Sequence, residues 1–204
     1  MVIILWGDYL NRKTEILEAA TKSFTSFGYK ATTVEQVAKI ANVGKGTVYN
    51  FFENKQQLLQ FVVKNLIDEM QAEADKTLNP EDSFMTNAHN GLMKMLQFRD
   101  RHLLFAKLIE EERQLATPEV SQMLVKIEDE IVSYLADRIL IGIEKDEIIS
   151  CNPKHVAYLL LKAYKAFIVD WQATYSEKLH EEEILNLFEI TIFKGLAKKS
   201  DEVK

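Results

Sequence analysis

The sequence predicts an all-α fold of about nine helices, and three observations lead to that prediction. Apolar residues recur every three or four positions along most of the chain, which is the spacing of one helix face. The 204 residues include only 7 Gly and 3 Pro, too few for the many tight turns of an all-β fold. No segment alternates polar and apolar residues for long, as a half-buried strand does.

The first fifty residues predict three short helices. Ile16, Ala20 and Phe24 lie on one face of the first, and Gly28 follows where helices often end in a left-handed residue. A capping box of Thr33 and Gln36 opens the second helix. The letters "NVG" interrupt the helical pattern, and the third helix begins near residue 44. The last two helices are therefore joined by a tight turn.

The helices expected from Lys55 onward are longer. The first of them runs to about Leu78, and a break is expected near Arg99–Asp100. A capping residue followed by proline predicts the start of three later helices, at Asn79-Pro80, Thr117-Pro118 and Asn152-Pro153. The final helix has glutamates in its first turn and lysines in its last, which suits the helix dipole.

Composition narrows the class of protein. Apolar residues form 47% of the chain and charged residues 27%, as in ordinary globular domains. The single cysteine, Cys151, excludes an intrachain disulfide and a cysteine-based zinc site, and it fits a cytoplasmic location. The opening "MVIILW" is too short for a signal-peptide core or a membrane span. We therefore expect residues 1–11 to pack on the first domain, and no membrane partner.

Charge is distributed unevenly along the chain. The net charge is −6, but the first 60 residues carry seven basic and five acidic side chains, which leaves +2 there and −8 in the remainder. A mildly basic N-terminal region on an acidic body permits phosphate contacts at that one end.

Residues 44–52 raise a specific question, because a short helix rarely accepts two glycines. On a helical wheel Val48 and Phe52 lie on the side that faces the core. The opposite side carries a cation, a phenol, an amide and bare backbone, from Lys45, Tyr49, Asn50 and Gly46. A recognition helix needs such groups in the major groove of DNA. The alternative is a small three-helix bundle with a solvated polar face.

The segment "ILEAATKSFTSFGYKATTVEQVAKIANVGKGTVYNFFENKQQLL" resembles the N-terminal helix-turn-helix domain of the TetR/AcrR family of bacterial repressors. The matching features are Phe-Gly-Tyr at the end of the first helix, Thr-Thr before the second, Gly-Thr-Val-Tyr in the third and Phe-x-Asn-Lys before the fourth. The resemblance covers residues 12–60, and beyond it only helix lengths and order match. It implies a helix-turn-helix DNA-binding domain at residues 1–54 and a larger helical ligand-binding and dimerisation domain at residues 55–204.

The family pattern implies a transcriptional regulator, expected to act as a repressor, that binds a near-palindromic double-stranded DNA operator as a homodimer. Carried over by position, it makes Thr33 and Lys55 phosphate contacts. The groove-facing set is Lys45, Gly46, Thr47, Tyr49 and Asn50. Phe51 stands where many members have His or Tyr, which predicts a lost polar contact. Glu53 stands where Lys or Gly is common, which adds a negative charge near the phosphates.

The last two long helices are apolar on almost all sides, and such helices are normally buried on all sides. A second copy is the expected cover, in a four-helix dimer interface; the alternative is a larger monomer core. The predicted interface residues are Leu160, Tyr164, Phe167, Trp171, Leu185, Phe188 and Ile192.

Methionine and aromatic side chains are frequent in the middle helices. Together they favour a site for an apolar or amphipathic small molecule, drug-like or fatty acyl in type, although each residue alone could be plain core. The candidate ligand-binding residues are Met70, Phe84, His89, Met93, Phe105, Arg113 and Met123. Effector binding is expected to shift the long fourth helix and release the operator.

No catalytic residue, cofactor or metal site is expected. Glu177 and His180 have the Glu-x-x-His spacing of di-iron bundles, but those need a second such pair, and the sequence has none. No glycine-rich phosphate loop, nucleophile elbow or zinc pattern occurs. The remaining alternative is a helical ligand-binding or protein adaptor whose helix-turn-helix no longer reads DNA.

Overall fold

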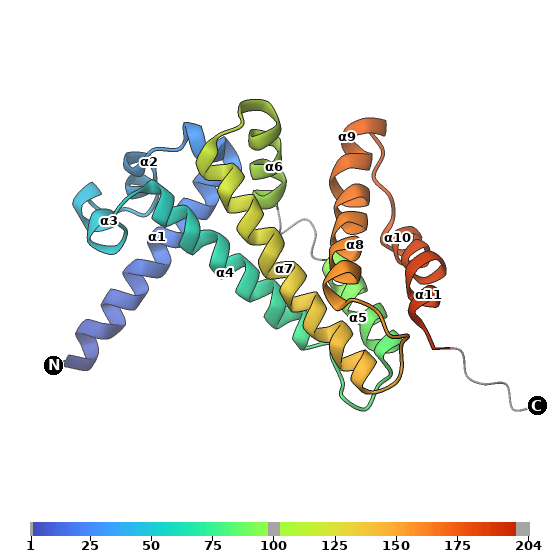
Figure 1. The fold of residues 1–204 in the computed structure, drawn as a ribbon. Coiled ribbons are helices and arrows are strands. Elements are labelled where there is room, and N and C mark those ends of the chain that lie inside the picture. Colours follow the sequence, from blue (N-terminus) through green and yellow to red (C-terminus); the bar gives the residue numbers. More distant parts are fainter. Residues whose placement is uncertain (1, 98–102, 199–204) are drawn as a thin grey trace, which may run out of the picture. The chain divides into compact units, whose positions relative to one another are not determined.

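The computed structural model describes residues 2–97 and 103–198, and this part of the chain is helical almost throughout (Figure 1). The α-helices are α1 Val2–Ala31, α2 Val34–Ile40, α3 Lys45–Phe51, α4 Lys55–Asp75, α5 Phe84–Gln97, α6 Leu103–Leu115, α7 Pro118–Glu144, α8 Pro153–Lys165, α9 Trp171–Tyr175, α10 Glu181–Phe188 and α11 Lys194–Leu196. Two π-helical segments, η2 Ala166–Asp170 and η3 Glu189–Phe193, join α8 to α9 and α10 to α11.

These segments form nine continuous helices in the described residues, because α8–η2–α9 and α10–η3–α11 each run without a break. Extended pairing is limited there to one isolated bridge between Ile148 and Ala197. The predicted all-α class, with a helix-turn-helix followed by a larger helical part, is confirmed. Within the same residues, no helix combines the length and the apolar character that crossing a bilayer requires.

The chain packs into two compact units. Unit 1 is formed by Met1–Asp68 with Arg101–Ile127, and unit 2 by Glu69–Asp100 with Glu128–Lys204. Helices α4 and α7 therefore start in unit 1 and continue into unit 2. The boundary predicted between residues 54 and 55 is a functional one, between a DNA-binding and a ligand-binding domain. It stays a prediction.

The core of unit 1 joins the first four helices to one another. Each helix contributes one apolar face, as the periodicity predicted, because an amphipathic helix is stable when that face leaves water. The most deeply buried of these side chains are Ile16, Ala20, Phe24, Val37, Val48, Phe52, Leu58, Leu59 and Val62.

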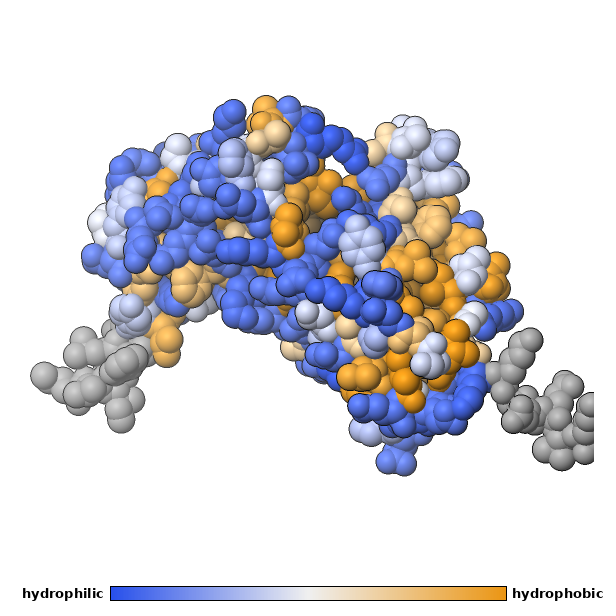
Figure 2. All heavy atoms as spheres, viewed as in Figure 1, coloured by the Kyte–Doolittle hydropathy of each residue, from blue (hydrophilic) through white to orange (hydrophobic). Residues whose placement is uncertain are grey.

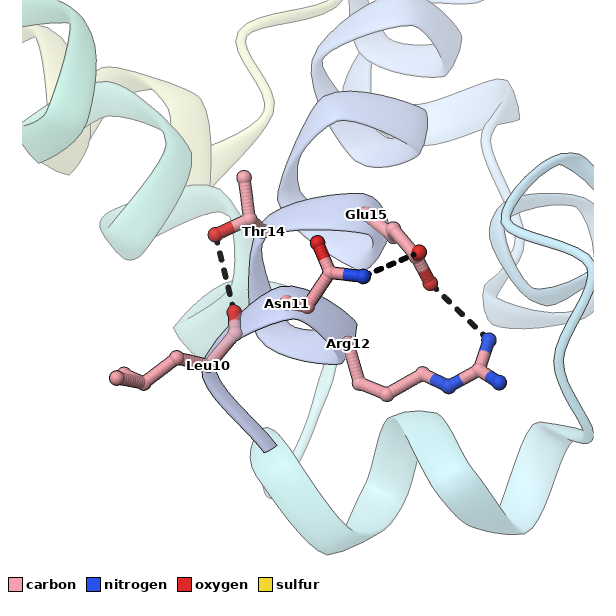
Figure 3. A network of polar contacts seen from close by, with 5 residues as sticks. All are labelled: Leu10, Asn11, Arg12, Thr14 and Glu15. Carbon is pink, nitrogen blue, oxygen red and sulfur yellow. Dashed lines mark hydrogen bonds and ion pairs between the residues drawn. The ribbon is translucent and has the colours of Figure 1, made fainter. Parts of the chain in front are cut away.

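Helix α1 begins ten residues earlier than the sequence pattern indicated. Its backbone is helical from Val2, so residues 2–11 are part of the first helix. Figure 3 shows the side-chain bonds that support α1 around residues 10–15. Asn11 and Arg12 donate to Glu15 at 3.1 Å each, and Thr14 donates to the Leu10 carbonyl at 3.0 Å. Bonds between residues three and four apart support a helix. The side chains of residues 2–8 lie outside the described ones.

The regular part of α1 ends at Gly28, as predicted. Gly28 has φ of +81°, a conformation that side-chain-bearing residues rarely adopt. A Cβ at Gly28 would also lie 2.5 Å from Oε2 of Glu111, on α6. The glycine thus satisfies both a backbone and a packing requirement.

The start of α5 was predicted at Asn79-Pro80, and this was wrong. The helix begins at Phe84, because Ser83 provides the cap: its Oγ accepts from the Thr86 amide at 3.1 Å. Asn79 instead makes a turn, accepting from the Glu81 amide at 3.2 Å.

The other two cap-and-proline starts are confirmed. Helix α7 begins at Pro118, and α8 begins at Pro153 with the Asn152 side chain accepting from the His155 amide at 3.2 Å. The break expected near Arg99–Asp100 lies outside the described residues.

Unit 2 is built around two clusters of buried apolar side chains contributed by α5, α7, α8 and α10 with its continuation. The π turn η3 sets the geometry of one cluster. Phe188 and Phe193 are five residues apart, so on a regular α-helix they would point about 140° away from each other. The wider turn lets both rings enter the same cluster, with centroids 6.1 Å apart.

Replacing Gly28 with Ala should lower the free energy of unfolding by about 1–3 kcal/mol, since a left-handed residue gains a side chain where Glu111 already lies. Denaturant titration followed by circular dichroism measures the change. Gly91→Ala is the matched control, because a Cβ at that helical position meets nothing within 4 Å. Equal stability of the two variants would contradict the strain assigned to Gly28.

Candidate nucleic-acid interface

Helices α2 and α3 form a helix-turn-helix whose local geometry is set by capping. The predicted capping box is present: Thr33 Oγ1 accepts from the Gln36 amide at 3.2 Å, and the Gln36 side chain accepts from the Thr33 amide at 2.8 Å. The turn closes through Asn42, whose φ is +53°. Asparagine tolerates this left-handed conformation better than most residues. Gly44 then stands at the N-cap of α3.

Helix α3 has two opposite faces, as the helical wheel predicted. Val48 and Phe52 are each 1% exposed and pack into the core of unit 1. Lys45, Gly46 and Asn50 are exposed on the other side, and Tyr49 is 45% exposed. Thr47 is half-buried between them. A cation, an aromatic hydroxyl and an amide are therefore presented outward from a helix that the core holds in place.

The glycines of α3 are not required by the packing of the protein itself. A Cβ at Gly46 would meet nothing within 4 Å, and one at Gly44 would meet the Thr47 hydroxyl at an ordinary 3.8 Å. Neither residue has a positive φ. The space above Gly46 is therefore open to a molecule from outside.

Lys45 has an internal partner on the preceding helix. Its ammonium forms an ion pair with Glu35 of α2 and lies 5.7 Å from the centre of the Tyr49 ring. The hydrogen bond with Glu35 raises the pKa of Lys45, and the same bond lowers the pKa of Glu35. Both groups are exposed, so an anion from outside the protein can compete with Glu35 for the ammonium.

Lys55 has an internal role that the sequence did not predict. Its Nζ donates to the carbonyl oxygens of Tyr29 at 2.9 Å and Thr32 at 3.0 Å, and it lies 4.3 Å from the centre of the Tyr29 ring. Burial lowers the pKa of this ammonium. The predicted phosphate contact of Lys55 stays a prediction, and it would have to coexist with these bonds. No local pattern reveals them, because 23 and 26 residues separate the partners.

Phe51 and Glu53 were the two departures from the family pattern. The ring of Phe51 packs against Tyr9 of α1, with centroids 4.5 Å apart, so this position joins α3 to α1. Glu53 is exposed, and its amide donates to the Gln57 side chain at 2.7 Å. The contact of Tyr9 was missed because the first helix was expected to begin after it.

The seven candidate effector residues are divided between the two units. Phe105, Arg113 and Met123 belong to unit 1, and Met70, Phe84, His89 and Met93 to unit 2. In unit 2 the Phe84 ring packs against Gly142, His89 pairs with Glu189, and Met93 lines an open cavity of about 590 Å³. The other residues that line this cavity are Gln97, His180, Glu181 and Glu182.

Six of the seven predicted interface residues pack on the apolar clusters of unit 2, and Trp171 is the exception. Leu185 and Phe188 are 5% and 2% exposed in a core cluster, and Trp171 stacks on Tyr175. The other four are partly buried against that core or its neighbour. Large apolar side chains that do face outward are found on the same helices, at Tyr158, Leu159 and Ile190. Figure 2 shows the corresponding hydrophobic surface over the part of unit 2 that contains α8 and α10.

Glu177 and His180 do not form a metal-binding pair on a helix. They lie in the non-helical connection between α9 and α10, and the His180 amide donates to Glu183 at 2.8 Å as part of the cap of α10. Across the residues that the structure covers, no group of three or more potential metal-binding side chains occurs.

Comparison with known proteins agrees with this geometry. Residues 16–62 match the family described as bacterial regulatory proteins, tetR family. The HTH-type transcriptional regulator YhgD of Bacillus subtilis (strain 168) is 43% identical over 188 residues, which cover 92% of this chain and 98% of that protein.

Two solved structures share the fold over most of their length. One is the SmeT–triclosan complex, with a TM-score of 0.74 and 15% identity, covering 93% of both chains. The other is the fatty acid degradation regulator FadR from Bacillus halodurans, with a TM-score of 0.71 and 16% identity, covering 88% of this chain and 93% of that one. The sequence match to a full-length relative, together with the helix-turn-helix, establishes that this chain belongs to the TetR family of bacterial helix-turn-helix transcriptional regulators.

Proposed function

We propose that the protein is a dimeric repressor that binds a near-palindromic DNA operator through α3 and releases it when a lipophilic small molecule binds. The observation that carries the DNA-reading part is the outward face of α3, which combines exposed Lys45, Tyr49 and Asn50 with open space above Gly46. Lysine suits phosphates and guanine edges, and asparagine suits adenine. Residues 1–54 supply this function, and residues 55–204 supply effector binding and dimerisation.

The phosphate contacts are assigned to the ends of the helices around α3. Thr33 is exposed at the start of α2, and the family pattern assigns it a phosphate contact. Lys55 opens α4, and Thr47 adds a hydroxyl beside Gly46. Repression, in preference to activation, follows from the family resemblance.

The effector is assigned to the class of apolar or amphipathic molecules, either drug-like or fatty acyl. Two proteins of the same fold support this class: one is described in complex with triclosan and the other as a regulator of fatty acid degradation. The methionine and aromatic candidates in both units provide adaptable apolar contacts for such a molecule. An adaptor that no longer reads DNA is the alternative, and the DNA experiment below separates the two.

The proposed DNA contact is tested by selection of bound fragments from genomic DNA of the source organism, at moderate salt to suppress non-specific binding. The wild-type protein should enrich inverted repeats whose half-sites are about one turn, ~34 Å, apart.

Gly46→Ala should keep the fold but lower affinity for the selected duplex by about tenfold or more, because the new methyl group would occupy space that DNA needs. Gly91→Ala is the control. A flat selection profile for the wild-type protein would favour the adaptor.

Replacing Glu35 with Gln should raise affinity for the selected duplex by about two- to fivefold, because it frees Lys45 and removes a negative charge close to the phosphates. Fluorescence anisotropy at two salt concentrations measures the change. Glu110→Gln provides the control, since it alters the net charge equally at an exposed position of α6. Unchanged or weaker binding by Glu35→Gln would show that Lys45 does not approach DNA.

Dimerisation through the last two helices is tested at Leu159 of α8, which is 53% exposed, as Ile190 of η3 is 48% exposed. Leu159→Glu should give folded monomers in sedimentation velocity, because a self-complementary interface would bury the new charge twice. Val125→Glu, at a 69% exposed position of α7, should leave the dimer intact. A dimer that survives Leu159→Glu would place the interface elsewhere.

A further inference from the structure

Every buried polar side chain identified in the described residues lies in one small region of unit 1. These side chains are Ser23, Thr32, Glu111 and Thr117. Glu111 is the charged member, and its residue is 6% exposed. Taking a carboxylate out of water is costly unless hydrogen bonds replace its hydration. The hydrogen bonds that offset the cost of burying the Glu111 carboxylate therefore indicate its role.

The Glu111 carboxylate binds the main chain of the turn that leads into the helix-turn-helix. Its Oε2 accepts from the Tyr29 amide at 2.6 Å, and its Oε1 accepts from the Lys30 amide at 3.0 Å. The missing side chain of Gly28 makes room for this approach, as a Cβ there would lie 2.5 Å from Oε2. The turn at residues 28–32 runs directly into Thr33, the cap of α2.

The same turn is held from its carbonyl side by Lys55. This ammonium binds the carbonyl oxygens of Tyr29 and Thr32, while the Thr32 hydroxyl donates to the Gly28 carbonyl at 2.7 Å. The main-chain amides of this turn are thus bound by the Glu111 carboxylate, and its carbonyl oxygens are bound by the Lys55 ammonium. The position of α2, and with it that of α3, depends on both.

Both helices that run from unit 1 into unit 2 begin at this cluster. Helix α4 begins with Lys55, and α7 begins immediately after Thr117, whose hydroxyl donates to Glu111 Oε1 at 3.1 Å. A displacement of either helix along its axis would therefore act directly on the groups that hold the turn.

We propose that Glu111 is the positioning residue that couples the DNA-reading helices to unit 2, by joining the start of α7 to the turn before α2. This inference rests on the proposed function, since it assumes that α3 reads DNA. Coupling is reciprocal, so DNA bound at α3 must change unit 2 as much as a change in unit 2 alters DNA affinity. The link can therefore be tested with DNA alone, without knowledge of the effector.

The experiment compares hydrogen exchange of unit 2, in peptides covering α8 and α10, with and without a saturating amount of the selected duplex. In the wild-type protein DNA should change exchange there by about twofold or more. In Glu111→Gln the amide group can replace only part of the bonding, so DNA affinity should fall by about tenfold or less. With DNA at saturation, however, the DNA-induced change in hydrogen exchange of unit 2 should be at most half as large in Glu111→Gln as in the wild-type protein. A purely structural role would lower affinity and leave that change intact.

Glu110→Gln, one residue away and exposed, should behave as the wild type. Thr117→Val keeps the carboxylate in the turn but removes its bond to the start of α7, so it should also reduce the change in unit 2, and it decides the question if Glu111→Gln fails to fold. Full-size changes in both folded variants, or no change in unit 2 of the wild type on DNA binding, would overturn the coupling role. Absence of selective DNA binding by the wild type would instead overturn the proposed function, and this inference with it.

Discussion

The helix-turn-helix of this protein depends on a carboxylate bound to main-chain amides. The first helix must stop at Gly28 for α2 to begin at Val34, and the stop leaves the amides of Tyr29 and Lys30 to be satisfied. Glu111 supplies the acceptors from a helix more than 80 residues later in the chain. Unsatisfied amides inside a protein are destabilising, so this one group holds the end of α1 against α6.

The two faces of α3 follow different requirements. The inner face is selected for packing: Val48 and Phe52 fix the helix in the core of unit 1. The outer face gives up stabilising contacts, since Gly46 contributes no side chain and the ion pair of Lys45 is with an exposed carboxylate. Such a surface makes little sense for stability and is consistent with a family whose members read DNA.

Features set by neighbouring residues could be predicted from the sequence. The capping box at Thr33 and the proline helix starts at Pro118 and Pro153 depend only on residues close in sequence, and all three are present. The helix start predicted at Asn79 was wrong for a local reason as well, because Ser83 caps α5 four residues later. The outward side of α3 followed from periodicity alone, since its inner face is so clearly apolar.

Features set by residues distant in sequence could not be predicted. Lys55 and Glu111 each bind the turn at residues 28–32, and no spacing rule connects positions that far apart. Which side of the last two helices faces outward could not be predicted either, because a helix that is apolar on all sides has no polar face to mark the exposed side. Leu160 and Leu159 are equally apolar and adjacent, yet Leu160 packs against the core while Leu159 is exposed.

The π turn at Glu189–Phe193 has a consequence for comparing this protein with its relatives. Such a turn holds one more residue than the α-helical turn it replaces, and every side chain beyond it is rotated by about 100°. A relative with an uninterrupted last helix has no counterpart for that extra residue. Alignment of the two sequences therefore needs a one-residue gap at this turn, and without it Leu196 would be matched to a position on a different side of the helix.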